Sequence, residues 1–179
     1  MPPISEAMLF AYADPPYLGN GKKRYAPFHN DASQYDSMQS HFDLIKRLTN
    51  EYENGWAMSL NPKDLVWALP ACPPNVRVMA WTKTFYQIRV NVSTQYAWEP
   101  LLVFGGRNMK DRRPMTRDWL SCPIAMRKGL PGAKPDKFYQ WLLDVLGWQP
   151  HDTVDDLFPG TNGLSNLIAK LSAGNDATN

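Results

Sequence analysis

The fold class is decided by the stretch Met8-Leu-Phe-Ala-Tyr-Ala-Asp14-Pro15-Pro16-Tyr17. The run from 8 to 13 is apolar or aromatic throughout, which predicts a strand buried on both faces, as in a sheet covered by helices on both sides. Pro15 and Pro16 cannot donate to a strand ladder, so they end the strand. Asp14 is therefore expected at the carboxyl edge of the sheet, where open α/β sheets bind their ligands.

Further along the chain, short apolar runs alternate with helical patterns, which is typical of an α/β fold. Strands are predicted at 56–60, 76–81, 100–104 and 153–158, and helices at 42–50, 62–69, 135–146 and 164–171. Residues 18–37 are predicted to form a polar loop. Pro135 near the first turn and Gly147 at the end mark the bounds of the clearest helix. We expect a mixed, mostly parallel sheet with helices on both faces.

Composition points to one globular domain that comprises residues 1–179. Hydrophobic residues make up 44% and charged residues 20% of the chain, which excludes an intrinsically disordered protein. No apolar run reaches the length of a membrane span, and the N-terminal stretch lacks the basic start of a signal peptide. Cys72 and Cys122 stand 50 positions apart and form no metal-binding or disulfide pattern. These features predict a soluble, cytoplasmic protein.

The net charge of +2 hides a local excess of basic residues. Nine basic residues stand against three acidic ones between positions 107 and 137, and a second basic cluster follows the Pro-Pro-Tyr stretch. Such a pattern suits a surface that faces a polyanion, with the loop at about 105–133 as an insertion that faces nucleic acid; solvated loops explain the charge equally well. The candidate nucleic-acid contacts are Lys22, Lys23, Arg24, His29, Arg107, Arg112, Arg113 and Arg117.

The chemistry of the Asp14 segment favours recognition of an amino group on a flat ring. A carboxylate and a backbone carbonyl freed by the prolines can each accept one hydrogen of an exocyclic amine. Tyr17 offers a face on which a base can stack. An ordinary strand-ending turn is the alternative explanation, because Asp and Pro are common turn residues.

The tetrapeptide Asp14-Pro15-Pro16-Tyr17 resembles the catalytic motif of the amino-group DNA methyltransferases, in particular the N6-adenine type. The following segment Leu18-Gly-Asn-Gly-Lys-Lys-Arg-Tyr25 is similar to the Gly- and Lys-rich loop of the phage-type members. The resemblance implies that these four residues are catalytic and that the enzyme methylates the N6 amino group of adenine in DNA. His29 lies further along the predicted loop 18–37, where either a role near the target base or an ordinary surface position fits.

Two later segments resemble the cofactor-binding elements of the same family. Lys134-Pro135 is similar to the element that holds the methionine end of S-adenosylmethionine, and Asp156-Leu-Phe-Pro-Gly-Thr-Asn-Gly163 is similar to the glycine-containing cofactor loop. Asn162 stands where that loop commonly has its last glycine. The residues implied in cofactor binding are Asp14, Lys134, Asp156, Phe158, Gly160, Thr161 and Asn162. Because the catalytic motif precedes the cofactor loop, the resemblance implies a compact, permuted Rossmann-like methyltransferase fold.

The segments 78–83 and 98–105 resemble paired strands of the messenger-RNA adenosine methyltransferases and their bacterial and phage relatives. RNA adenosine methylation is therefore an alternative, although Tyr17 stands where RNA-type relatives usually have Trp, which favours DNA. Many relatives continue into a strand that binds the cofactor ribose, whereas only Asn175 and Asp176 remain here. A non-catalytic nucleic-acid-binding partner is the second alternative. No metal is expected, and a phage-encoded member would act in the host cytoplasm.

Overall fold

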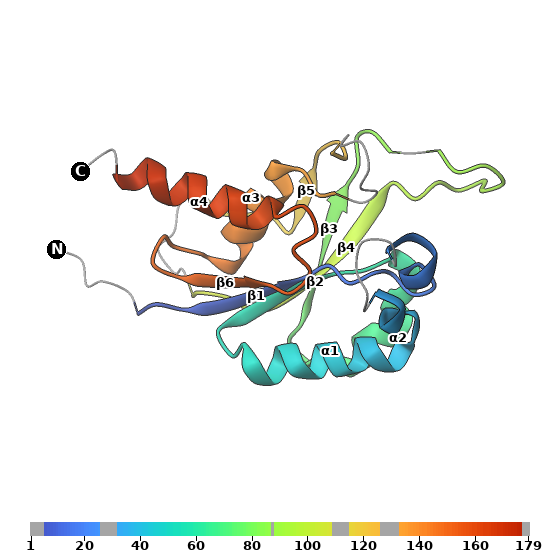
Figure 1. Cartoon of the computed structure of the whole chain (residues 1–179), viewed down its shortest axis with the longest axis horizontal. Helices are drawn as coiled ribbons and strands as arrows, with labels where there is room; N and C mark the ends of the chain where they lie inside the picture. Colours follow the sequence, from blue (N-terminus) through green and yellow to red (C-terminus); the bar gives the residue numbers. More distant parts are fainter. Residues whose placement is uncertain (1–5, 26–31, 87, 109–114, 126–132, 177–179) are drawn as a thin grey trace.

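The computed structural model describes residues 6–25, 32–86, 88–108, 115–125 and 133–176. These residues form a six-stranded sheet in the order β5-β3-β4-β2-β1-β6 (Figure 1). The strands are β1 (Leu9–Ala13), β2 (Gly55–Ser59), β3 (Arg77–Thr82), β4 (Trp98–Gly105), β5 (Trp119–Ser121) and β6 (Thr153–Asp156). The α-helices are α1 (Met38–Glu51), α2 (Leu65–Ala68), α3 (Asp136–Leu146) and α4 (Gly163–Asp176).

The strands run mostly in one direction. β1 pairs in parallel with both β2 and β6, and β3 pairs in parallel with β5. β4 lies between β2 and β3 and is antiparallel to both, so it alone among these strands runs the opposite way. The predicted mixed, mostly parallel sheet is confirmed. The carboxyl ends of the other five strands and the start of β4 consequently share one edge, called here the carboxyl edge.

Each face of the sheet packs against its own pair of helices (Figure 1). Phe10 and Tyr12 of β1 pack in the apolar core under α3 and α4, whereas Ala11 and Ala13 pack in the core under α1 and α2. Successive side chains of a strand point to opposite faces. An apolar run without alternation is therefore what a strand with two covered faces requires, and the predicted helices on both faces are confirmed.

The helix α3 begins and ends as its sequence predicts. Pro135 caps it in an extended conformation, and the following residues present an apolar stripe that includes Phe138, Trp141 and Leu142. Gly147 ends the helix with φ of 69°, the left-handed conformation that glycine adopts without steric cost. The Trp148 amide then donates to the Leu143 carbonyl at 2.9 Å. This closure fixes where the chain leaves the helix towards β6.

The described parts of the predicted polar loop, residues 18–25 and 32–37, contain regular turns that the sequence did not predict. These are a π-helical turn (Gly21–Tyr25) and a 3₁₀ turn (Ala32–Asp36). The Asp36 carboxylate accepts hydrogen bonds from the amides of Gly21 at 2.7 Å and Lys22 at 2.8 Å. The prediction missed this anchor because the two ends of the contact lie about 15 residues apart, beyond the reach of a local pattern.

Two strand predictions also need correction. β5 was not predicted, because three residues after a basic segment give no alternating pattern; it forms as an edge strand on β3. β6 ends at Asp156 and not at Phe158. The Phe158 amide turns to donate to the Asp156 carboxylate at 3.2 Å, so the chain leaves the sheet there.

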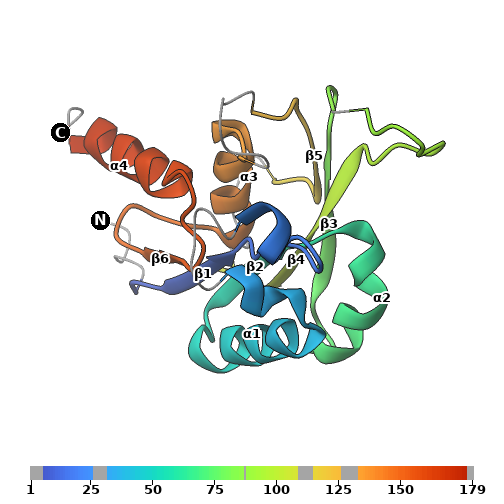
Figure 2. The same ribbon diagram turned by 45° about the vertical axis from the view of Figure 1, so that its right-hand side comes forward.

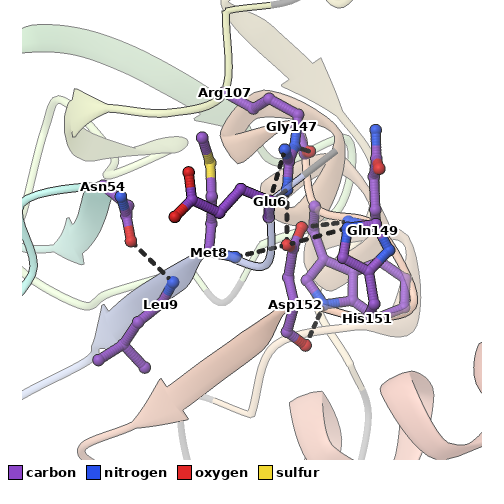
Figure 3. Close-up of polar contacts among 10 residues, drawn as sticks. Glu6, Met8, Leu9, Asn54, Arg107, Gly147, Gln149, His151 and Asp152 are labelled. Atoms are coloured by element: carbon purple, nitrogen blue, oxygen red, sulfur yellow. Dashed lines mark hydrogen bonds and ion pairs between the residues drawn. The ribbon is translucent and has the colours of Figure 1, made fainter. Parts of the chain in front are cut away.

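A buried ion pair lies at the edge of the sheet opposite the carboxyl edge, called here the amino edge (Figure 3). Arg107, just after β4, donates to Asp152, just before β6, at 2.5 Å, and their side chains are 7% and 0% exposed. The Asp152 carboxylate also accepts the amides of Met8 at 2.8 Å and Gln149 at 2.7 Å. The cluster thus ties together the entry to β1, the exit from β4 and the entry to β6.

No helix among the described residues meets the length and apolarity needed to span a membrane.

Candidate active site

The sheet topology brings five chemically active side chains to the carboxyl edge. Asp14 follows β1, Lys83 follows β3, and Asp156 ends β6. Glu99 lies at the start of β4 and reaches the same edge because β4 runs the opposite way. Lys134 immediately precedes the Pro135 cap of α3. Residues separated by more than 100 positions therefore meet at one edge of the sheet.

An ion-pair network connects four of these side chains with Tyr17. The Lys134 ammonium lies 2.8 Å from Asp14 Oδ2 and 3.2 Å from Glu99 Oε2. The Tyr17 hydroxyl donates to Glu99 Oε2 at 2.7 Å, and the Lys83 ammonium donates to Glu99 Oε1. Glu99 is thus the centre of the network. The two ammonium groups balance the two carboxylates, which is what lets four ionised groups share a largely buried position.

Burial and charge act on the two carboxyl groups in opposite directions. Burial raises the pKa of Asp14, and although Lys134 lowers it, the Glu99 charge adds to the rise. Burial would also raise the pKa of Glu99, but Lys134 and Lys83 outweigh it and lower that pKa to about 2. Glu99 is therefore ionised at any physiological pH. Asp14 is the more basic carboxylate and the better hydrogen-bond acceptor of the two.

Lys134 is held as a cation although its side chain is only 3% exposed, compared with 22% for Asp14. Burial would lower the pKa of Lys134, but the charges of Asp14 and Glu99 raise it well above its usual value. Its ammonium lies 5.8–5.9 Å from the ring centroids of Tyr17, Trp81 and Phe138. Aromatic faces at this distance attract a cation and exclude water from it. The carboxylate contact and the rings fix where the ammonium lies.

Asp14 keeps part of its acceptor capacity. Lys134 occupies Oδ2, and among the described residues no group donates to Oδ1. Pro15 is buried and Pro16 partly buried, and neither has an N–H group. The segment that follows β1 thus presents hydrogen-bond acceptors at the carboxyl edge. A ligand with an amino group meets these acceptors without competition from neighbouring backbone donors.

The turn after β6 has the backbone conformation of a glycine-rich loop. Gly160 has φ of 47° and Asn162 has φ of 56°, both in the left-handed region. Asn tolerates this region better than most residues, which explains why it can stand where glycine is common. Gly163 begins α4, and a Cβ atom there would lie 2.5 Å from Cε2 of Tyr139. Glycine at this position therefore lets α4 approach α3 closely.

Asp156 is a second carboxyl group with a raised pKa. Burial raises its pKa to about 6; the Phe158 amide lowers it, and the charge of nearby Asp14 raises it further. Among the described residues no basic side chain pairs with Asp156. A cationic ligand group beside this carboxylate would relieve the cost of its charge. Phe158 packs under α1 and meets the Tyr35 ring at 5.0 Å, and Thr161 is partly buried.

The candidate nucleic-acid contacts lie in different environments. Lys22 and Lys23 are exposed on the π-helical turn that also contains Arg24. Arg117 is exposed beside β5, whereas Arg107 belongs to the buried pair at the amino edge. We therefore assign Arg107 a structural role and leave it out of the proposed interface. His29, Arg112 and Arg113 lie outside the described residues.

Sequence reasoning missed Lys83 and Glu99 as site residues. Glu99 pairs with Trp81 in the β3–β4 register, and Lys83 follows two positions later on the same face. The signal was available, because both residues lie in segments that resemble paired strands. Finding it required the strand register, which the sequence pattern did not supply.

Among the described residues, no group of three or more His, Cys, Asp or Glu side chains is arranged to hold a metal ion.

No family model and no curated protein matches the chain. Among solved structures, it is similar to the crystal structure of the M1.HpyAVI–SAM complex, with a TM-score of 0.54 and 15% sequence identity. The alignment covers 92% of this chain and 79% of that chain. At this identity the likeness shows the fold, so the chain has the α/β fold of the protein in that complex.

Proposed function

We propose that this chain transfers a methyl group from S-adenosylmethionine to the N6 amino group of adenine in DNA. The observation that carries the proposal is the state of Asp14. Its carboxylate is partly exposed and has a raised pKa, and none of the described residues donates a hydrogen bond to its Oδ1. Asp14 lies at the carboxyl edge, followed by two prolines without donors. This arrangement suits an exocyclic amine, which has two hydrogens to donate.

Asp14 orients the amino group in this account. Its free oxygen accepts one hydrogen of the amine, and the Pro15 carbonyl accepts the other. Positive charge would develop on the nitrogen as it took the methyl carbon from the sulfonium, whose sulfur would keep the electron pair of the broken bond. A fixed carboxylate would stabilise that charge until the nitrogen released a proton to solvent. The target adenine must leave the DNA stack to reach this position, which costs a few kcal/mol. Glu99 and Lys134 keep Asp14 in place while the base enters.

The same edge offers groups that fit S-adenosylmethionine, which supplies an activated methyl group when bound. Asp156 lacks a basic partner among the described residues and suits the α-ammonium of the cofactor. The left-handed turn at Gly160 and Asn162 leads to the N-terminus of α4, where backbone N–H groups suit a carboxylate. M1.HpyAVI, which has the same fold, was crystallised in complex with SAM, and this adds support. That Lys134 also binds the cofactor carboxylate stays a prediction, because the Lys134 ammonium is already paired with Asp14 and Glu99.

Methyl transfer to DNA and to RNA oligonucleotides of the same sequence shows which nucleic acid is the substrate. The cofactor carries a tritiated methyl group in both assays. We expect incorporation into DNA at a rate at least tenfold above that into RNA. Preferred incorporation into RNA would favour the RNA adenosine alternative. Calorimetric titration of S-adenosylmethionine distinguishes the non-catalytic alternative, because a protein without affinity for the cofactor cannot be the transferase.

Tyr17 is proposed to stack on the target base, with its hydroxyl anchored by Glu99. Tyr17→Phe keeps the ring and loses one hydrogen bond, so we expect a loss of less than about tenfold in kcat/KM for DNA. Tyr17→Ala removes the ring, and loss of base stacking of about 1–3 kcal/mol raises KM for DNA by about 5- to 150-fold. The KM of Tyr17→Trp for DNA should be closer to that of Tyr17→Phe than to that of Tyr17→Ala.

Tyr52→Phe is the matched control, because the Tyr52 hydroxyl also donates to a carboxylate, that of Asp155, at 2.9 Å. Equal kinetics for Tyr17→Ala and Tyr17→Trp would remove the stacking role.

Binding of S-adenosylmethionine should weaken as the pH falls below the Asp156 pKa of about 6. The carboxylate binds the α-ammonium only when ionised, so affinity is full above this pKa and falls by up to about tenfold per pH unit below it. Titrations between pH 7.5 and pH 5 measure the slope. Asp156→Asn should bind more weakly at pH 7.5 and show a flatter dependence on pH. An unchanged slope in Asp156→Asn would assign the titration to another group.

A further inference from the structure

The outer strands of the sheet present an aromatic face on the side of α1 and α2. In the strand register Trp98 lies opposite Thr82, and Trp119 lies opposite Ala80. Residues directly opposite one another point to the same face, as do alternate residues of one strand. Val78, Ala80 and Thr82 of β3 therefore share a face with both tryptophans. Trp81 points the other way, into the core under α3.

The helices leave this face partly open. The core under α1 and α2 is built on β1, β2 and β4. Beyond it, Val78 is 42% exposed, Trp98 is 37% exposed and Trp119 is 46% exposed. Figure 2 shows the hairpin between β3 and β4 projecting away from the helices beside these strands. Val78, Trp98 and Trp119 thus form an exposed apolar patch, and such patches mark interaction sites.

The charges around this surface are basic. The Arg117 guanidinium lies 5.4 Å from the Trp119 ring centroid, and the Arg89 guanidinium lies 5.4 Å from that of Tyr96 in the hairpin. The sequence from 77 to 98 contains no acidic residue. The nearby Asp118 forms an exposed pair with Arg77 at 3.7 Å. Aromatic rings interleaved with cations suit a nucleic-acid strand, whose bases stack and whose phosphates are anionic.

The surface reaches the carboxyl edge beside the candidate active site, on the other face of the sheet. Trp98 precedes Glu99, which points to the opposite face and holds Lys134 and Tyr17. Thr82 precedes Lys83 in the same way. Strand spacing and rise place the Cα atoms of Trp98 and Trp119 about 12 Å apart, with the small side chains of Ala80 and Thr82 between them. A strand that leaves the carboxyl edge can thus pass over this face.

We propose that Trp98 and Trp119 form a stacking platform that holds unpaired nucleotides of the DNA strand beside the target adenine. The platform binds the bases by their flat faces, with Arg117 beside the strand to neutralise phosphate charge. Because it holds the strand that carries the target base, its role depends on the function proposed above. A two-fold contact between copies of this chain is disfavoured, because such a contact would bring the same basic surface against itself.

Anisotropy of a labelled single-stranded oligonucleotide tests the platform with the full chain. Trp119→Phe keeps a flat ring, whereas Trp119→Leu keeps an apolar side chain without one. We expect Trp119→Phe to bind within a few-fold of wild type and Trp119→Leu to lose affinity by about 5- to 150-fold. Trp98→Phe and Trp98→Leu should follow the same order. Val66→Ala, which alters an exposed apolar side chain on α2, is the matched control and should bind as wild type does.

Two further measurements keep the outcomes distinct. Binding of S-adenosylmethionine should be unchanged in the Leu variants, because the platform lies outside the cofactor residues. Light scattering should give the same mass for wild type and variants. Leu variants that bind DNA as well as wild type would overturn the platform, and so would a mass that falls in those variants, which would assign the face to self-association. If binding depends on the tryptophans but wild type transfers no methyl group, the proposed function fails and the strand-binding surface stands.

Discussion

Replacing Asp14 by Asn is expected to lower kcat for methyl transfer to DNA by at least about 10²-fold, the typical cost of removing one group that stabilises developing charge. The carboxamide keeps the shape of the side chain but has only one acceptor oxygen. Lys134 lies 2.8 Å from the carboxylate and is expected to take that oxygen, so the new amide would point its N–H groups at the amine. Two donors then face each other where donor and acceptor are needed.

The variant should fold but be less stable than wild type, because Glu99, 3.2 Å from Lys134, must then balance both Lys134 and Lys83. Thermal unfolding and titration of S-adenosylmethionine check that the variant is folded and able to bind. Asp155→Asn is the matched control. Asp155 lies on the adjacent strand β6, and its carboxylate accepts a hydrogen bond from the Tyr52 hydroxyl on the α1 side of the sheet. A rate in Asp14→Asn within a few-fold of wild type would show that Asp14 is not catalytic.

Replacing Asp152 by Ala is expected to destabilise the fold by about 3–5 kcal/mol, because it leaves the Arg107 charge buried without its partner. The amides of Met8 and Gln149 also lose their acceptor. Burial alone would raise the pKa of Asp152, but the hydrogen bonds from Arg107 and the two amides outweigh it and lower the pKa. The stabilisation from its charge is therefore full above the unfolded value near 3.8 and is lost as the pH falls through the lower folded value.

Urea unfolding at neutral pH measures this cost. Glu51→Ala is the matched control, because the Arg47–Glu51 pair has a similar distance of 2.9 Å but side chains that are 52% and 53% exposed. Its removal should cost less than about 0.5 kcal/mol. Asp152→Asn should keep methyl transfer at temperatures where it is folded, since it lies at the edge opposite Asp14. Equal losses in Asp152→Ala and Glu51→Ala would show that burial adds nothing to this pair.

Local sequence patterns predicted the features that depend on neighbouring residues. The buried strand that ends just before Asp14, the stop of α3 at Gly147 and the turn before α4 follow from apolar runs, prolines and glycines. Glu99 as the centre of the ion-pair network did not follow, because its partners Tyr17, Lys83 and Lys134 come from three other segments that only the tertiary fold brings together. Arg107 was interpreted by its basic neighbours in the sequence, whereas its partner Asp152 lies 45 residues away.

Transfer of a trideuterated methyl group to DNA tests whether this chain methylates the N6 amino group of adenine. Wild-type protein is incubated with duplex DNA and the labelled cofactor, and the digested nucleosides are analysed by mass spectrometry. We predict N6-methyladenine that carries three deuterium atoms, formed by wild type and lost in Asp14→Asn. Label on cytosine, or no labelled nucleoside from protein that is folded and supplied with the cofactor, would contradict the account.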